Sequence, residues 1–219
     1  MDEYRSRRQD QSVGEEIANA VTHGLGALLA VAGLVVLVVF ASLRGTALDI
    51  VSLAIYGSTL VLLYSASTLY HAVRGPRTKA ILNILDHAAI FLLIAGTYTP
   101  FTLVSIGGVV GWTLFVIVWT LAVAGVLFKV FHRTHGDRVS LPLYLAMGWL
   151  MIVATGELWG SVGAGGTLWL LVGGLAYTTG TVFYLWERMP FNHTVWHLFV
   201  LAGSACHFTA VTLYVLPGA

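Results

Sequence analysis

Long apolar runs dominate the pattern of this chain, and short breaks rich in glycine, proline or charge separate them. Each run approaches the roughly 20 apolar residues that an α-helix needs to cross the hydrocarbon core of a bilayer. None shows the strict alternation of apolar and polar residues that a membrane β-barrel requires. The pattern predicts seven transmembrane helices, near residues 20–42, 47–72, 80–103, 109–131, 140–158, 167–186 and 194–216.

Composition agrees with a chain that lies mostly in lipid. Apolar residues make up 58% of the 219 residues and charged residues only 10%, and the mean hydropathy is +0.84. A soluble domain carries about 25% charged residues. The net charge of +1 offers no basic surface for nucleic acid, so membrane lipids are the expected partners. We expect an all-α, seven-helix transmembrane domain over residues 17–219, after a polar cytoplasmic amino terminus over residues 1–16.

The distribution of Lys and Arg predicts the orientation of the bundle. Arg44 is the one basic residue that the predicted spans place on its side of the membrane. The other ten flank the helices on the opposite side: Arg5, Arg7, Arg8, Arg74, Arg77, Lys79, Lys129, Arg133, Arg138 and Arg188. Basic residues accumulate in cytoplasmic loops. The amino terminus is therefore predicted in the cytoplasm and the carboxyl terminus outside.

Two histidines open the last apolar run in the order HxxxH, at His193 and His197. On an α-helix this spacing places both rings on one face, where they can share a divalent metal ion. In the predicted topology His71 ends the second helix and Asp86 lies in the first turns of the third. All four residues therefore fall at a similar depth near the cytoplasmic side. Ionisable groups at this depth usually face a bundle interior or a cavity.

Three neutral imidazoles and a water molecule form the coordination set of a catalytic zinc ion. We therefore predict Zn²⁺ bound by His71, His193 and His197, with Asp86 to hold or deprotonate the water. Ser67, four residues before His71, can orient the water or a substrate carbonyl. The alternative for Ser67 is a hydrogen bond to the preceding carbonyl of its own helix. The alternative for the cluster is a hydrated helix-end interface that contacts loops and lipid headgroups.

Further polar residues are predicted to surround the metal site rather than ligate the ion. Glu16, Asn19 and His23 form one stripe on the first helix, which can support the site or cover it. The alternative for this stripe is helix capping at the membrane surface. His207 follows His197 by ten residues, or roughly 15 Å along a helix. It is too distant to ligate the same ion, and we expect it to form a structural hydrogen bond.

These motifs together resemble those of the hemolysin III family of bacterial membrane proteins. The family is related to the progestin and adipoQ receptors and more distantly to alkaline ceramidases. The resemblance rests on the following residues: Glu16-x-x-Asn19-x-x-x-His23, Ser67-x-x-x-His71, Asp86, His193-x-x-x-His197 and His207-Phe208. It implies a seven-helix protein of the bacterial inner (plasma) membrane, with zinc held by the three matching histidines. It also implies hydrolysis of a lipid amide or ester, as in ceramidases, or a role in membrane homeostasis.

Three functions stay open from the sequence. The first is a zinc-dependent lipid hydrolase, and the second is a receptor-like or homeostatic protein with structural zinc. The third is a pore-forming haemolysin, although the spans lack the continuous polar stripe that a water-filled channel needs. Gly173 and Gly174 permit close helix packing within or between subunits, so an oligomer remains open as well.

Overall fold

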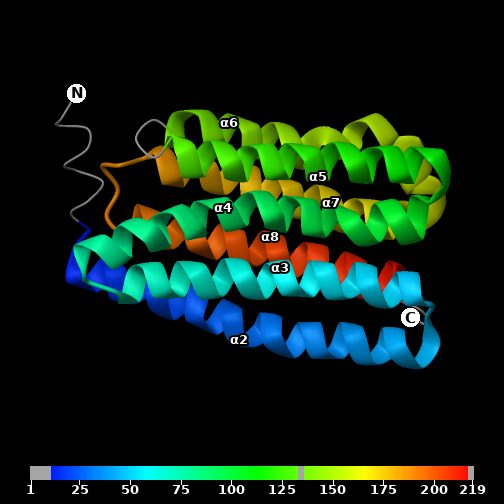
Figure 1. Cartoon of the computed structure of the whole chain (residues 1–219), viewed down its shortest axis with the longest axis horizontal. Helices are drawn as coiled ribbons and strands as arrows, with labels where there is room; N and C mark the ends of the chain where they lie inside the picture. Colours follow the sequence, from blue (N-terminus) through cyan, green and yellow to red (C-terminus); the bar gives the residue numbers. More distant parts are fainter. Residues whose placement is uncertain (1–10, 133–135, 217–219) are drawn as a thin grey trace.

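The structure is a computed structural model that describes residues 11–132 and 136–216. Within these ranges the regular structure is entirely helical, as predicted (Figure 1). Two segments depart from the α form: η1, a π-helix, and η2, a 3₁₀-helix. In chain order the elements are α2 (Val13–Arg44), α3 (Ala47–Ala72), α4 (Pro76–Pro100), η1 (Phe101–Ile106), α5 (Gly108–Phe131), α6 (Gly136–Gly148), η2 (Trp149–Ala154), α7 (Thr155–Leu185) and α8 (Asn192–Tyr214).

Local sequence signals mark the residues at which the first three described helices begin. Ser12 caps α2 and pairs with Glu15 in a capping box, while Thr46 and Asp49 form the same arrangement at α3. In a capping box each side chain satisfies a backbone N–H that lacks a partner within the helix. Pro76 begins α4, where the missing N–H of proline costs nothing. These caps place helix starts at the breaks between the apolar runs.

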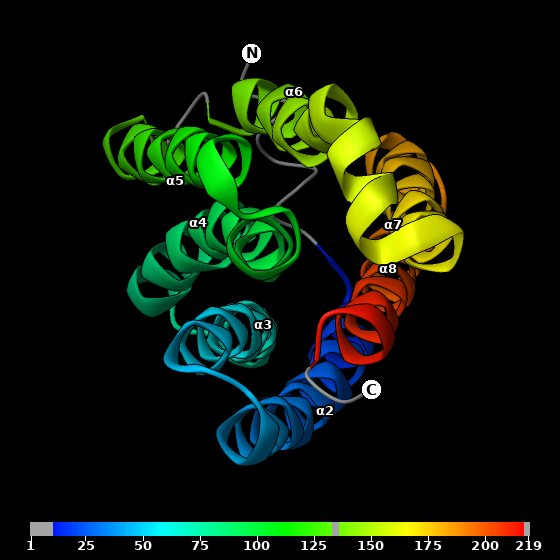
Figure 2. The same cartoon turned by 90° about the vertical axis from the view of Figure 1, so that its right-hand side faces the viewer.

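The helices surround one another in chain order, and the last helix returns to the first. Viewed along the long axis of the bundle, α2 to α8 follow one another around a ring, and α8 lies beside α2 (Figure 2). Contacts between α2 and α8 close this ring, in addition to those between α2 and α3 and between α7 and α8. Residues near the two ends of the chain therefore come together in space.

Two glycines allow the chain to turn between helices. Gly163 lies inside α7 with φ 65° and ψ −173°, and Gly107 precedes α5 with φ 61° and ψ −162°. Both conformations are essentially restricted to glycine, because a Cβ atom would clash with the backbone. The segment α7 therefore consists of two helices that meet at a kink at Gly163. The residues after Gly163 then run back along α6 (Figure 1).

Six stretches of the described chain are long and apolar enough to cross a membrane. Four begin and end within about four residues of a predicted helix, with 47–72 coinciding with α3, whereas Val13–Arg44 begins earlier than the predicted 20–42. The fifth stretch in chain order, Val139–Leu185, is 47 residues long and contains two of the predicted spans. α2 begins at Val13, inside the segment predicted as the polar amino terminus. Outside the described residues lie several of the basic residues used for the orientation: Arg5, Arg7, Arg8, Arg133 and the side chain of Arg138.

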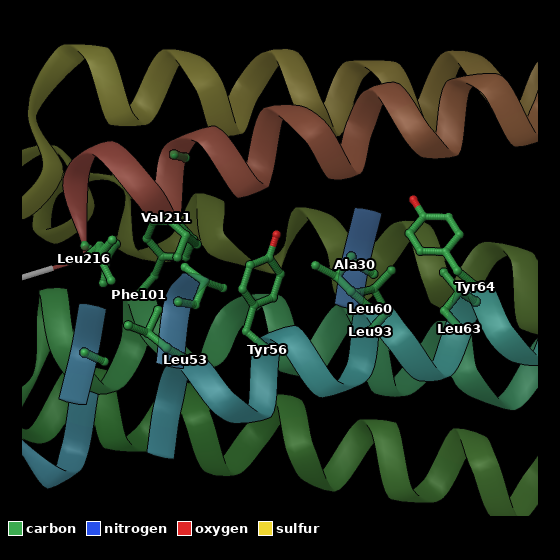
Figure 3. Close-up of a cluster of buried hydrophobic side chains, with 14 of the residues drawn as sticks. Ala30, Leu53, Tyr56, Leu60, Leu63, Tyr64, Leu93, Phe101, Val211 and Leu216 are labelled. Atoms are coloured by element: carbon green, nitrogen blue, oxygen red, sulfur yellow. The ribbon is translucent and has the colours of Figure 1, made fainter. Parts of the chain in front are cut away.

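The core lies where α2, α3, α4 and α8 meet. Leu37, Leu53, Tyr56 and Phe101 are almost completely buried in it. Figure 3 shows Tyr56 and Tyr64 on α3, with their hydroxyl groups directed towards α8. The Tyr64 hydroxyl donates a hydrogen bond of 2.6 Å to Ser204 Oγ. This packing fixes α3 against α8, the two helices that carry the predicted metal ligands.

Candidate metal centre

The structure brings His71, His193 and His197 together at one end of the bundle. One nitrogen from each ring lies within 4.8 Å of the others, a spacing that allows all three to ligate one ion. The ring centroids of His71 and His193, and of His71 and His197, are 5.1 Å apart, and those of His193 and His197 are 4.6 Å apart. His71 comes from the end of α3, and the other two come from the first turns of α8. The predicted convergence of these histidines therefore occurs.

Two of these rings present buried nitrogens that suit a metal ion. His71 Nε2 and His197 Nδ1 are shielded from solvent, and no residue in the described part of the chain forms a hydrogen bond with them. A buried polar atom without a partner is destabilising, and few such atoms occur in native proteins. A divalent ion would satisfy both nitrogens, and imidazole nitrogen is a preferred ligand of zinc. The residues present therefore fit a metal site.

Glu16 fixes the orientation of the His71 ring. His71 Nδ1 donates a hydrogen bond of 2.7 Å to Glu16 Oε2, so in the neutral ring Nε2 keeps its lone pair for an ion. Lys79 Nζ donates to the second oxygen, Oε1, at 2.5 Å. Carboxylate groups commonly orient metal-binding histidines in this way and raise their basicity. Ser12 and Glu15 form the capping box of α2, and Glu16 lies beside them in the same first turn, where its charge also complements the helix dipole.

The start of α8 is held against the start of α2. Thr194 Oγ1 donates to Asn19 Oδ1 at 2.6 Å, and Asn19 Nδ2 donates to Gln11 Oε1 at 2.8 Å. The backbone N–H of Phe191 donates to Glu15 Oε1 at 3.0 Å. Phe191 has φ 56°, a left-handed conformation that is strained for a bulky residue. These contacts determine where α8 begins, and therefore where its two histidines lie.

His23 stacks on one of the candidate ligands. Its ring lies parallel to that of His197, with centroids 3.4 Å apart and 10° between the planes. Tyr64 contacts His23 edge-on at 5.0 Å. Both nitrogens of His23 are buried, and no described residue forms a hydrogen bond with them. His23 therefore packs directly on one of the candidate ligands.

Asp86 and Ser67 line a cavity that begins at the histidines. The cavity has a volume of about 150 Å³, and His193, His197 and His23 contribute to its wall. Ser67 is completely buried and does not donate to the preceding carbonyl of its helix. Away from the histidines the wall is mainly apolar, with contributions from α3, α4, α6, α7 and α8, among them Leu63, Ile90, Leu93, Leu145 and Val200.

Of two further polar residues, His207 agrees with the expectation and Lys129 differs from it. His207 lies at the far part of the same cavity, and its Nδ1 donates to the carbonyl of Gly203 at 2.8 Å, which is the expected structural hydrogen bond. Lys129, counted above with the cytoplasmic flanking residues, is only 1% exposed. The sequence held one sign that Lys129 is buried, because this lysine lies within an otherwise apolar run.

Comparisons with known proteins agree with the resemblance expected from the motifs. A family model described as "Haemolysin-III related" matches residues 11–208. The chain is 50% identical over 212 residues to "Hemolysin-3" of Bacillus cereus, covering 97% of each chain. It is 50% identical over 203 residues to "Hemolysin-3 homolog" of Bacillus subtilis (strain 168), covering 93% of this chain and 95% of that relative. It is also 27% identical over 210 residues to "Monocyte to macrophage differentiation factor" of Homo sapiens, covering 92% and 84%.

Proposed function

Since this chain belongs to the haemolysin-III-related family of membrane proteins, we propose that its histidine cluster serves catalysis. In this proposal the protein is a zinc-dependent hydrolase of lipid amide or ester bonds in the bacterial plasma membrane. The observation that carries the proposal is the position of the cluster. Two of the three imidazoles that can hold an ion, those of His193 and His197, line a mainly apolar cavity, and the Asp86 carboxylate lines the same cavity. A lipid chain fits such a wall, and its polar linkage would then lie beside the histidines.

The residues have distinct roles in this reaction. His71, His193 and His197 would hold Zn²⁺, which when bound acts as a Lewis acid and activates water for attack on a carbonyl. Asp86 accepts the proton that water loses, and returns it to the leaving amine or alkoxide. The Ser67 hydroxyl donates a hydrogen bond to the substrate carbonyl oxygen as negative charge develops on it. Glu16, through His71, holds one ligand in place.

Release of a fatty acid by purified protein tests the proposal. Zinc-loaded protein in liposomes is incubated with ceramide or with phospholipid, and the free fatty acid is measured by mass spectrometry. We expect product from the unmodified protein and a loss of at least about 100-fold for Asp86→Asn, because a general base contributes about 10²–10⁴-fold to a rate. The metal content of the variant should stay unchanged.

A carboxylate at the other end of the bundle supplies the control. Glu157→Gln alters an exposed residue in the first turn of α7 and should leave the turnover unchanged. Turnover by Asp86→Asn at the original rate would reject Asp86 as the base. Metal binding without any lipid product, together with a lower melting temperature after chelation, would indicate the structural role for zinc.

The same proposal includes the orientation of the bundle in the membrane. The 47 residues of Val139–Leu185 would reach roughly 70 Å as one helix, and the hydrocarbon core is about 30 Å thick. With the turn at Gly163 we infer two crossings here and seven in total. By the bounds of the helices, one end of the bundle holds the histidines and, among the described residues, also Arg74, Arg77, Lys79, Lys129 and Arg188, whereas Arg44 ends α2 at the other. The positive-inside rule then places the histidines near the cytoplasm.

Reporter fusions test this orientation directly. Alkaline phosphatase joined after the last residue should be active, because the carboxyl terminus would lie outside, where the enzyme folds. A green fluorescent protein at the same place should not fluoresce after export. The reverse pattern would contradict the seven crossings or the cytoplasmic amino terminus.

A further inference from the structure

His207 lies well inside the bundle, away from the metal centre. It follows His197 by ten residues on the same helix, which corresponds to roughly 15 Å along the axis. Both residues nevertheless line one continuous cavity. A lipid chain with its polar linkage at His197 would therefore extend towards His207.

The His207 ring has one nitrogen engaged and one available. Nδ1 donates to the carbonyl of Gly203 at 2.8 Å, so in the neutral imidazole Nε2 carries a lone pair and accepts hydrogen bonds. No residue within 11–132 or 136–216 forms a hydrogen bond with Nε2. The ring is held in place on two sides. Tyr177 packs against it with centroids 5.4 Å apart, and Gly173 faces it so closely that a Cβ atom would collide with it.

Other polar groups in this part of the cavity already have partners. Thr178 Oγ1 donates to the carbonyl of Gly174 at 2.8 Å and accepts from Trp149 Nε1 at 3.0 Å. The Tyr98 hydroxyl donates to the carbonyl of Met147 and accepts from the N–H of Met151, both at 2.8 Å. His207 Nε2 therefore differs from these neighbours, because it offers an acceptor to a molecule inside the cavity.

We propose that His207 forms a second binding subsite, which accepts a hydrogen bond from a hydroxyl group on the lipid chain. The preferred ligand is then a hydroxylated acyl chain whose hydroxyl lies about as far from its polar head as His207 lies from His197. This inference rests on the proposed function, because the same cavity must hold the chain of the substrate. A hydroxyl placed elsewhere along the chain would be buried against apolar side chains without a partner, at a cost in affinity.

Binding of fatty acids to the metal-free protein tests the subsite without requiring turnover. The probes are stearate and a set of hydroxystearates with the hydroxyl at successive carbon positions, and dissociation constants are measured in detergent by competition with a fluorescent fatty acid. We expect one hydroxystearate to bind about 5- to 10-fold more tightly than stearate, which is the size of one well-formed hydrogen bond. Hydroxyls near either end of the chain should weaken binding.

Two variants assign the preference to the ring of His207. His207→Phe removes the acceptor and should make the dissociation constants of stearate and of the preferred hydroxystearate equal, a comparison made within the variant itself. His207→Gln keeps an acceptor and should retain part of the preference, which also covers the case in which His207→Phe does not fold. Equal affinity for all hydroxystearates and stearate, or a preference that survives in His207→Phe, would overturn the subsite alone. If neither stearate nor any hydroxystearate binds, the cavity does not take acyl chains and the proposed function fails as well.

Discussion

Replacing Glu16 by glutamine isolates the effect of its negative charge on the metal centre. The amide oxygen of glutamine can still accept from His71 Nδ1, so the ring keeps its orientation while the charge is lost. A hydrogen bond to a charged group contributes about 1.5–3 kcal/mol, and one between neutral groups about 0.5–1.5 kcal/mol. The Glu16 side chain is 20% exposed, so solvent weakens the charge only in part. We therefore expect a loss of about 1–1.5 kcal/mol, or about 5- to 10-fold in zinc affinity.

Glu16→Ala removes the hydrogen bond as well and should weaken zinc binding by up to about 100-fold, the upper end for residues that orient a ligand. Competition with a chromophoric zinc chelator in detergent measures both variants. Lys79→Met breaks the contact of Glu16 with Lys79 but keeps the contact with His71, and should change the affinity by less than about 3-fold. Equal affinities for the unmodified protein and Glu16→Ala would refute the idea that Glu16 supports the ligand.

Three further predictions follow from the geometry. Chelation should lower the melting temperature, because an ion at 100 times its dissociation constant stabilises the folded chain by about 2.7 kcal/mol; an unchanged temperature in scanning fluorimetry would argue against a bound ion. His23→Ala should weaken zinc binding by about 2- to 10-fold, because the ring contact with His197 is lost. His23→Phe keeps a stacked ring and should restore the affinity in calorimetric titrations. An affinity as low as that of His23→Ala would show that a nitrogen of His23 is needed. Gly163→Ala should cost about 1–3 kcal/mol of unfolding free energy through backbone strain, whereas the helical control Gly160→Ala, which meets open space, should not destabilise in thermal denaturation.

Helical periodicity and depth were sufficient to predict the three-histidine cluster. The apolar runs located the helices within a few residues, and α3 coincides with the predicted span 47–72. Successive helices cross the membrane in opposite directions, so the end of the second predicted helix lies at the same depth as the start of the last. His71 and His193 could be assigned to the same depth because the depth of a residue depends only on its position along its own helix and on the direction of that helix.

Lateral contacts could not be predicted from the same pattern. Hydropathy does not record the order of helices around the bundle, so the apolar runs did not place α2 beside α8, and only the polar stripe of Glu16, Asn19 and His23 pointed to it. The stacking of His23 on His197 depends on that neighbourhood and on side-chain rotamers. Lys129 was counted among the cytoplasmic flanking residues because it lies near the end of a predicted span, although packing buries it. The continuous cavity likewise results from residues on six of the described α-helices and on η2 rather than from any one stretch.

The closure of the helix ring by α8 has a consequence for biogenesis. His71 enters the membrane early in translation, whereas His193 and His197 emerge only with the final helix. A nascent or truncated chain that lacks α8 holds one imidazole of the three and cannot retain the ion against cellular chelators. In the proposed function, metal capture would therefore come at the last step of insertion, when α8 joins α2. Incomplete copies in the membrane would then lack the ion.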